Sequence, residues 1–125
     1  MEEKLKRIYK ECIKELNKIG IDFNEKDISI CISKRSNKRY GCCKPEIPDK
    51  NYKEVTRKGF KYIVKYNNYK KYTIEISKWV MNLDDIIIKN TIMHELIHCL
   101  PYCNNHGVYF KKYANRMNTK LGYNI

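Results

Sequence analysis

Two histidines and a glutamate near the carboxyl end of the chain have a spacing that suits metal-assisted hydrolysis. His94-Glu95-Leu96-Ile97-His98 matches the pattern HExxH. Residues four apart on a helix project from one face, so His94 and His98 can bind one metal ion. Zinc prefers nitrogen ligands in a tetrahedral site and becomes catalytic when one position is left to water. Glu95 can then take a proton from that water and return it to a leaving amine.

The third metal ligand is expected to be His106. The chain has only three histidines, and all of them fall between positions 94 and 106. Pro101 interrupts the helical pattern, and the Asn-Asn-His-Gly segment that follows can turn the chain back toward the helix. We therefore predict one catalytic Zn²⁺ bound by His94, His98 and His106, although manganese, cobalt or nickel would accept the same ligands. The alternative is three histidines satisfied by hydrogen bonds in a packed core.

Three tyrosines lie near this site in the sequence. Tyr102, Tyr109 and Tyr113 each carry a hydroxyl that could donate a hydrogen bond to a developing oxyanion. Simple packing is the expected role of each one.

Three segments have the spacing of amphipathic helices. The first ends near Gly20 and carries an apolar stripe of Leu5, Ile8, Tyr9, Cys12, Ile13, Leu16 and Ile19. The second is expected to begin near Asn82, with Asp84 and Asp85 in its first turn, and to stop at Pro101. Its core side is formed by Ile88, Ile92, Leu96 and either Cys99 or Leu100, and its cleft side by Thr91, His94 and His98. The third has a buried stripe of Phe110, Tyr113, Ala114, Met117 and Leu121 and ends near Gly122.

Shorter segments alternate apolar and polar residues, as half-buried strands do. Residues 28–32 and 72–76 have this pattern, and residues 39–44 predict a shorter strand. We expect residues 60–66 and 71–77 to form a hairpin, and residues 45–59 to form a surface loop. The strand that ends at Ser77 is expected to lie along the cleft, where it could bind a substrate backbone by strand addition. The prediction is an α+β fold in one domain, residues 1–125: an N-terminal helix, a mixed or antiparallel sheet of three to four strands, the HExxH helix and a C-terminal helix.

The positive charge is concentrated in one segment. The net charge is +12, and residues 34–71 carry thirteen basic against three acidic side chains, a net of +10. Aromatic residues are scattered through the same segment: Tyr40, Tyr52, Phe60, Tyr62, Tyr66 and Tyr69. Basic side chains neutralise phosphates and aromatic rings stack on bases, so we expect nucleic-acid contact, with Lys34, Arg35, Lys38 and Arg39 as candidates. The alternative is a coding bias toward Lys, Asn, Ile and Tyr.

Neither a signal peptide nor a membrane span is expected. The first residues alternate charged and apolar side chains instead of forming a continuous apolar centre, which favours a cytoplasmic location. The six cysteines are then expected to be reduced, since neither the adjacent Cys42 and Cys43 nor the pair Cys99 and Cys103 has structural-zinc spacing.

Four segments together resemble the SprT-like domain of Spartan-type metalloproteases. They are SKRSNKRYGCC, YTIEISKWVM, TIMHELIHC and NNHGVYFKKYANRM. The matching positions are Arg39, Gly41 and Cys42, then Ile74, Ile76 and Ser77, then His94, Glu95 and His98, and finally His106, Gly107 and Phe110.

This resemblance implies a zincin-like fold, with His94, His98 and His106 as zinc ligands and Glu95 as catalytic acid and base. It also implies a protease that trims proteins crosslinked to or bound on DNA, which would place the chain at the nucleoid. The resemblance covers roughly residues 28–122, and no C-terminal zinc ribbon is expected, so DNA contact would fall to the zincin core. We expect a protein or peptide substrate and single-stranded DNA as partners, and no membrane.

Three functions remain open on these residues. The first is a zinc metalloendopeptidase that acts on DNA-associated or unfolded proteins. The second is a nucleic-acid-binding accessory protein with a mainly structural zinc. The third is a general or self-processing peptidase with no DNA role. Glu95 favours catalysis, because a purely structural zinc site does not need a carboxylate there.

Overall fold

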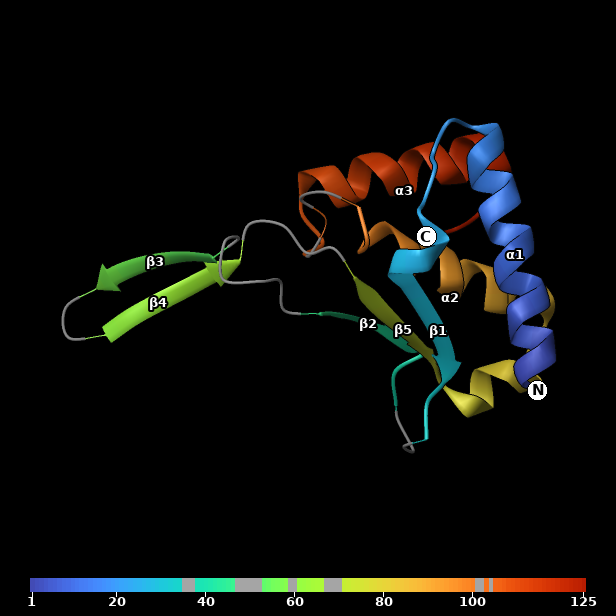
Figure 1. The fold of residues 1–125 in the computed structure, drawn as a ribbon. Coiled ribbons are helices and arrows are strands. Elements are labelled where there is room, and N and C mark those ends of the chain that lie inside the picture. Colours follow the sequence, from blue (N-terminus) through green and yellow to red (C-terminus); the bar gives the residue numbers. More distant parts are fainter. Residues whose placement is uncertain (35–37, 47–52, 59–60, 67–70, 101–102, 104) are drawn as a thin grey trace.

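The fold is described by a computed structural model for residues 1–34, 38–46, 53–58, 61–66, 71–100, 103 and 105–125, with the strands between 53 and 66 described at the level of the backbone (Figure 1). In chain order the elements are α1 (Glu2–Lys18), the 3-10 turn η1 (Glu25–Asp27), β1 (Ile28–Ile32), β2 (Gly41–Pro45), β3 (Lys53–Lys58), β4 (Lys61–Tyr66), β5 (Tyr72–Ile76), the 3-10 turn η3 (Lys78–Asn82), α2 (Asp85–Ile97) and α3 (Val108–Leu121). The predicted α+β class is confirmed. None of the helices in this part of the chain is long and apolar enough to cross a bilayer.

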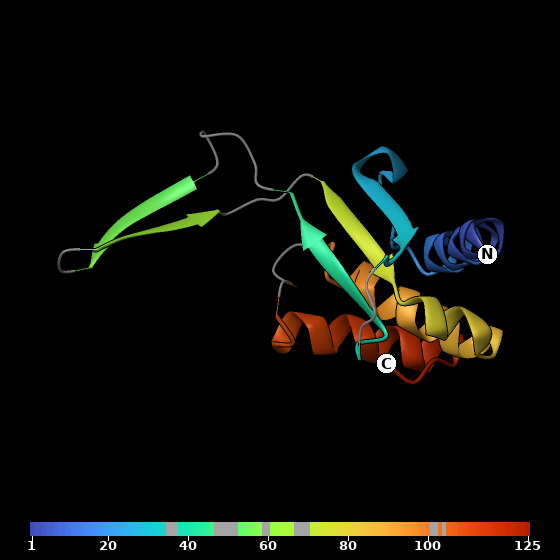
Figure 2. The ribbon, with the colours of Figure 1, turned by 90° about the horizontal axis from the view of Figure 1, so that it is seen from below.

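The central sheet is mixed, with the strand order β1-β5-β2. β5 runs parallel to β1 and antiparallel to β2, and Ile74 at its middle pairs with Ile30 on one side and Cys43 on the other. Along β5 the buried residues are Tyr72, Ile74 and Ile76, whereas the alternate residues are half-buried. The helices therefore cover one face of the sheet, with α2 across β5 and β2 and α1 beside it against β1 (Figures 1 and 2).

The strand pairing corrects two predictions. β4 pairs with β3, from Lys53 opposite Tyr66 to Lys58 opposite Lys61, so part of the predicted loop 45–59 is a strand. The hairpin predicted between residues 60–66 and 71–77 does not form, because β5 is already paired on both sides. Only two residues separate β3 from β4, which favours their pairing. The strand β3 was not predicted because its sequence is charged and has no apolar alternation. The residues that would have formed the turn of that predicted hairpin, 67–70, lie outside the described residues.

The β3–β4 hairpin extends away from the three-stranded sheet in both views (Figures 1 and 2). It forms its own two-stranded sheet. It also lies within the basic segment 34–71, so part of that excess charge is carried on an arm of the molecule.

The core forms where α1, α2 and β5 meet. The side chains with no exposed surface include Leu5, Ile8, Cys12, Leu16, Ile74, Ile76, Ile88, Ile92, Leu96 and Met117. The apolar stripe of the first helix is thus confirmed, with Ile19 only partly buried at its end. The last helix also buries its predicted face through Phe110, Ala114 and Met117.

The HExxH helix is shorter than predicted at both ends. It begins at Asp85, with Asp84 at the N-cap, because the preceding residues form η3. It ends at Ile97, and the next turn is tightened by bonds from the Cys99 amide to the Leu96 carbonyl and from the Leu100 amide to the Ile97 carbonyl. The chain therefore leaves the helix directly after the second histidine of the motif.

Gly41 at the start of β2 occupies a position with no room for a side chain. A Cβ placed there would lie 2.8 Å from the backbone oxygen of Glu75 and 3.3 Å from Cγ2 of Thr91. The Glu75 oxygen belongs to β5, so relief requires the two strands to move apart. We expect Gly41→Ala to lower the free energy of unfolding of the metal-free protein by about 1–3 kcal/mol in urea titration.

The control for this prediction is Ser29→Ala, at an exposed position on β1 of the same sheet. It should change the free energy of unfolding by less than about 0.5 kcal/mol. Equal losses in the two variants would show that the close approach at Gly41 is not the cause.

Candidate metal centre

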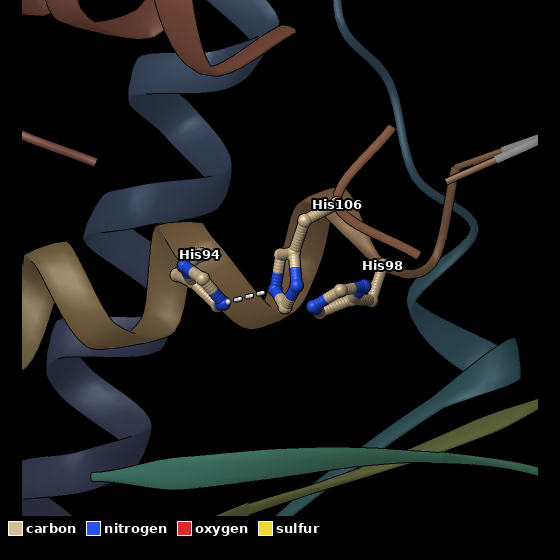
Figure 3. Close-up of side chains that lie close together, drawn as sticks. All are labelled: His94, His98 and His106. Carbon is tan, nitrogen blue, oxygen red and sulfur yellow. Dashed lines mark hydrogen bonds between the residues drawn. The ribbon is translucent and has the colours of Figure 1, made fainter. Parts of the chain in front are cut away.

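The three histidines converge on one point. His94 lies in the last turn of α2, His98 at its C-cap, and His106 in the segment just before α3. Figure 3 shows the rings of His94 and His98 projecting from the same side of the helix, with His106 coming between them from the loop. The ring centroids are 4.9 to 5.2 Å apart. This convergence is possible because α2 ends at Ile97. His106 follows His98 by only eight residues and lies against the same face of the helix.

The Nε2 atoms of His94 and His106 have the separation that two ligands of one tetrahedral metal require, and His98 lies close to both. Nε2 of His94 and Nε2 of His106 are 3.2 Å apart, and ligand atoms of all three residues lie within 4.8 Å of one another. Two nitrogens bound to one zinc at 2.0–2.1 Å in tetrahedral geometry would be separated by about 3.3 Å. The donor set and its spacing therefore fit a zinc-sized ion, and these three residues could hold a metal.

Two contacts outside the triad hold the rings in place. Nδ1 of His98 donates to the carbonyl oxygen of Cys103 at 2.8 Å, which leaves Nε2 of that ring unprotonated toward the site. The ring of Phe110 packs against all three imidazoles, with centroid distances of 4.8 to 5.0 Å. The sequence placed Phe110 in a buried stripe and among the positions that match the SprT-like domain, but it did not predict this contact with the imidazoles. The Cys103 contact has no sequence signal, because a backbone oxygen accepts the bond.

The environment keeps the imidazoles of His94 and His98 neutral. Burial, together with the neighbouring His98 and His106, lowers the pKa of His94 to about 4. Burial also lowers the pKa of His98, although its bond to the Cys103 carbonyl opposes the shift. A metal binds the neutral form of histidine, so at neutral pH these two ligands need release no proton.

Glu95 is almost fully buried beside the triad, with 6% of its surface exposed. Burial raises the pKa of its carboxyl to about 7, and the positive charge of Arg39 partly opposes this shift. Glu95 lines a cleft of about 420 Å³ together with the three histidines, Arg39 and residues of β2, and we call this cleft the metal cleft. It faces the cleft and has the proton affinity of a group that exchanges protons near neutral pH.

The raised pKa predicts that Glu95 destabilises the metal-free protein above neutral pH. The unfolded chain releases this proton near pH 4.5, whereas the folded protein retains it up to about pH 7. The stability associated with the neutral form is therefore fully present below pH 4.5 and is lost as the pH rises through 7. We expect metal-free Glu95→Gln to be more stable than wild type by about 3 kcal/mol at pH 8.

Urea unfolding in the presence of a chelator, at pH 8 and at pH 5, measures this difference. The gain of Glu95→Gln should shrink at the lower pH, because the wild-type carboxyl is then mostly protonated in the folded state. A gain that is the same at both pH values would show that it does not come from the buried charge.

The other residues singled out in the sequence are distributed unevenly. Lys34, Lys38 and Arg39 are exposed, and Arg39 alone of these lines the metal cleft. Arg35 lies outside the described residues, as does Tyr102. Tyr109 is exposed and Tyr113 is half-buried, and neither is among the described residues that line the cleft.

The six cysteines are free thiols in the structure. Sγ of Cys43 on β2 and Sγ of Cys99 just after α2 are 3.7 Å apart. The hydrogen bond with Cys43, together with burial, raises the pKa of the Cys99 thiol far above its ordinary value. The Cys99 thiol is therefore protonated where it packs against Cys43 of β2.

The structure is that of a small α+β protein with a candidate metal centre. The centre combines an HExxH helix, a third histidine from the following loop and a buried glutamate. Comparison with known families agrees with this class: the family model of the SprT-like family matches residues 9–125, nearly the whole chain. The chain belongs to the SprT-like family. Searches among curated proteins and among solved structures found no significant match.

Proposed function

We propose that this chain is a zinc metallopeptidase in which His94, His98 and His106 hold one Zn²⁺ and Glu95 is the general base. The observation that carries the proposal is the convergence of three imidazoles beside a buried carboxyl group whose pKa lies near neutrality. A site that served only to hold a metal for structure would not need that carboxyl. Membership of the SprT-like family supports the same activity.

The residues of the chain divide the chemistry between them. When bound, the zinc ion supplies a Lewis acid that polarises a peptide carbonyl and makes water more acidic. Glu95 accepts a proton from the attacking water and delivers it to the leaving amine, which its pKa of about 7 permits in both directions. The guanidinium of Arg39 lines the same cleft and can donate to the carbonyl oxygen as negative charge develops there.

β2 is the strand suited to hold a substrate backbone. The sequence suggested the strand that ends at Ser77 for this role, but that strand is β5, whose two edges are already paired. β2 lies at the edge of the sheet, and four of its five residues, Gly41, Cys42, Cys43 and Pro45, line the metal cleft. An extended substrate segment can add to this edge through main-chain hydrogen bonds, which gives broad sequence tolerance.

The substrate class that we propose is protein bound to or crosslinked on DNA, with single-stranded DNA favoured. The supporting features are the net charge of +10 over residues 34–71 and the exposure of Lys34 and Lys38. Arg39 joins this basic segment to the metal cleft, since it belongs to the first and lines the second. A DNA-linked role would place the chain in the cytoplasm, at the nucleoid.

The test is cleavage of a basic, unfolded protein by the zinc-loaded chain, with and without single-stranded DNA, beside Glu95→Gln. Cleavage that requires both Glu95 and DNA supports the full proposal. Cleavage that requires Glu95 but not DNA leaves a general or self-processing peptidase. If wild type and Glu95→Gln behave alike with DNA present, the chain is a nucleic-acid-binding protein with a structural metal.

The DNA contact is tested separately by charge reversal. Lys34→Glu with Lys38→Glu should weaken binding of single-stranded DNA and reduce its salt dependence, because each removes a contact to phosphate. The matched control is Lys111→Glu with Lys112→Glu, two exposed lysines on α3 with the same change in net charge. Equal affinities for the two double variants would remove the first pair from the DNA-binding surface.

A further inference from the structure

The metal cleft continues into a groove along α2. A second cavity of about 360 Å³ shares His94, Glu95 and Arg39 with the metal cleft and extends to Tyr40 and Asn90. A third cavity, of about 280 Å³, shares Tyr40 and Asn90 with the second and reaches the first turn of α2. A bound peptide that crosses the metal centre in this direction must therefore pass along α2 toward the N-terminal end of that helix.

The far end of this groove is apolar and exposed. Ile86 and Ile87 from the start of α2 and the ring of Tyr40 line it, with 58% of Ile86 and 51% of Tyr40 exposed. Trp79 packs edge-to-face on Tyr40, with ring centroids 4.8 Å apart, and extends this apolar surface. None of the described residues that line the third cavity carries a charge. Such a cluster of large exposed apolar groups is typical of a binding site.

The walls of this end are held in place from below. The backbone amide of Ser77 donates to the carbonyl oxygen of Tyr40 at 2.9 Å. Tyr123, which lines the opposite wall, is buried and donates its hydroxyl to Glu15 at 2.6 Å. Asn90 and Asn124 exchange two hydrogen bonds, of 3.0 and 3.2 Å, and connect α2 to the C-terminal segment. The apolar pocket is therefore preformed.

The distance from this pocket to Glu95 sets which substrate residue reaches it. Ile87 and Glu95 are eight residues apart on one helix, which corresponds to about 12 Å along its axis. An extended peptide advances about 3.3 Å per residue, so about four residues span this distance. The side chain that enters the pocket thus belongs to a residue about four positions from the scissile bond.

We propose that the third cavity, the Tyr40–Ile86 pocket, is a substrate subsite. It binds a bulky apolar or aromatic side chain about four residues from the scissile bond. This inference rests on the proposed peptidase function and names the substrate feature that the site selects. The occupant is an unfolded segment of a protein substrate, because folded proteins keep such side chains buried and cannot extend through the groove. The pocket adds side-chain selectivity to the sequence-tolerant contacts of β2.

The first arm of the experiment measures cleavage. A single phenylalanine is moved along an otherwise fixed unfolded peptide, the cleaved bond is mapped, and kcat/KM is compared with that of the peptide carrying alanine at the same position. Wild type should prefer phenylalanine by roughly tenfold at about the fourth position on one side of the bond. Ile86→Ser should abolish this preference, mainly through KM. Val108→Ser, at an exposed aliphatic residue in the first turn of α3 that does not line the groove, should retain it.

The second arm measures binding without hydrolysis. Trp79 is the only tryptophan of the chain and contacts Tyr40 on the pocket wall, so its fluorescence reports occupancy in the Glu95→Gln variant. The phenylalanine peptide should change this fluorescence at a lower concentration than the alanine peptide, and adding Ile86→Ser should remove the difference.

The two arms separate the possible failures. Equal binding and equal cleavage of the two peptides by wild type would overturn the subsite while leaving the peptidase intact. Selective binding that depends on Ile86, with no cleavage by any variant, would support the pocket and overturn the proposed function. A preference that survives Ile86→Ser would place the selecting pocket elsewhere and overturn the inference.

Discussion

Replacing Glu95 with glutamine is expected to reduce kcat for peptide hydrolysis by roughly 10²- to 10⁴-fold while zinc remains bound. Glutamine has the size of glutamate, but its amide cannot accept a proton from water and pass it on. The three histidines do not depend on this carboxyl, since no hydrogen bond or ion pair joins it to them among the described contacts. Zinc content per chain and single-turnover cleavage, measured on the same sample, separate the two effects.

The matched control for this loss is Glu75→Gln. Glu75 lies on β5, forms an ion pair with Lys44 at 3.2 Å, and does not line the metal cleft. It should retain cleavage close to that of wild type. If Glu95→Gln cleaved as fast as Glu75→Gln, another group would have to be the general base and the proposed mechanism would fail.

Replacing His106 with alanine is expected to weaken zinc binding by more than about 100-fold. Changes to groups that merely support a metal ligand already cost 10- to 100-fold in affinity, so loss of a ligand should exceed this range. His106 is exposed. Its removal leaves only His94 and His98, one ligand fewer than the three protein ligands of a catalytic zinc site. Zinc titration by calorimetry gives the affinity directly.

Thermal unfolding gives an independent measure of the same loss. For wild type at a zinc concentration of about 100 times Kd, the metal should stabilise the fold by about 2.7 kcal/mol, and a chelator should remove this gain. In His106→Ala the chelator should have little effect, whereas Val108→Ser should respond as wild type does. The metal-free forms of all three should unfold alike, because both replaced side chains are exposed. An equal chelator effect in wild type and His106→Ala would exclude His106 as a ligand.

Much of the candidate site could be predicted because its main features are local. The positions of His94 and His98 on one helical face follow from the helical repeat, and the third histidine lies only eight residues beyond. The same local periodicity predicted the apolar stripes of α1 and α3 and the alternation of β5, all of which the structure bears out. The resemblance to the SprT-like domain also included Gly41. Only the structure gives the reason, which is that Gly41 lies against the backbone of β5 and leaves no room for a side chain.

Predictions that required knowledge of distant partners were less successful. The alternation of β5 shows that it is a strand but not that it pairs with β1 and β2 instead of β4. That choice places an edge strand, β2, at the metal cleft and so changes which strand is available to a substrate. The charged segment of β3 was assigned to a loop because its strand structure comes from pairing with β4 and not from an apolar pattern.

The sequence by itself determined which residues are the candidates for the chemistry of this protein, because residue type and helical spacing are properties of a short stretch of chain. Only the tertiary structure decided how those residues behave. Burial of Glu95 raises its pKa, the Cys103 carbonyl and Phe110 orient the imidazoles, and Tyr40 meets Ile86 at the end of the groove. The environment of Glu95 and the pairing of Tyr40 with Ile86 depend on segments far apart in the chain, and the contact between His98 and Cys103 depends on how the intervening loop packs.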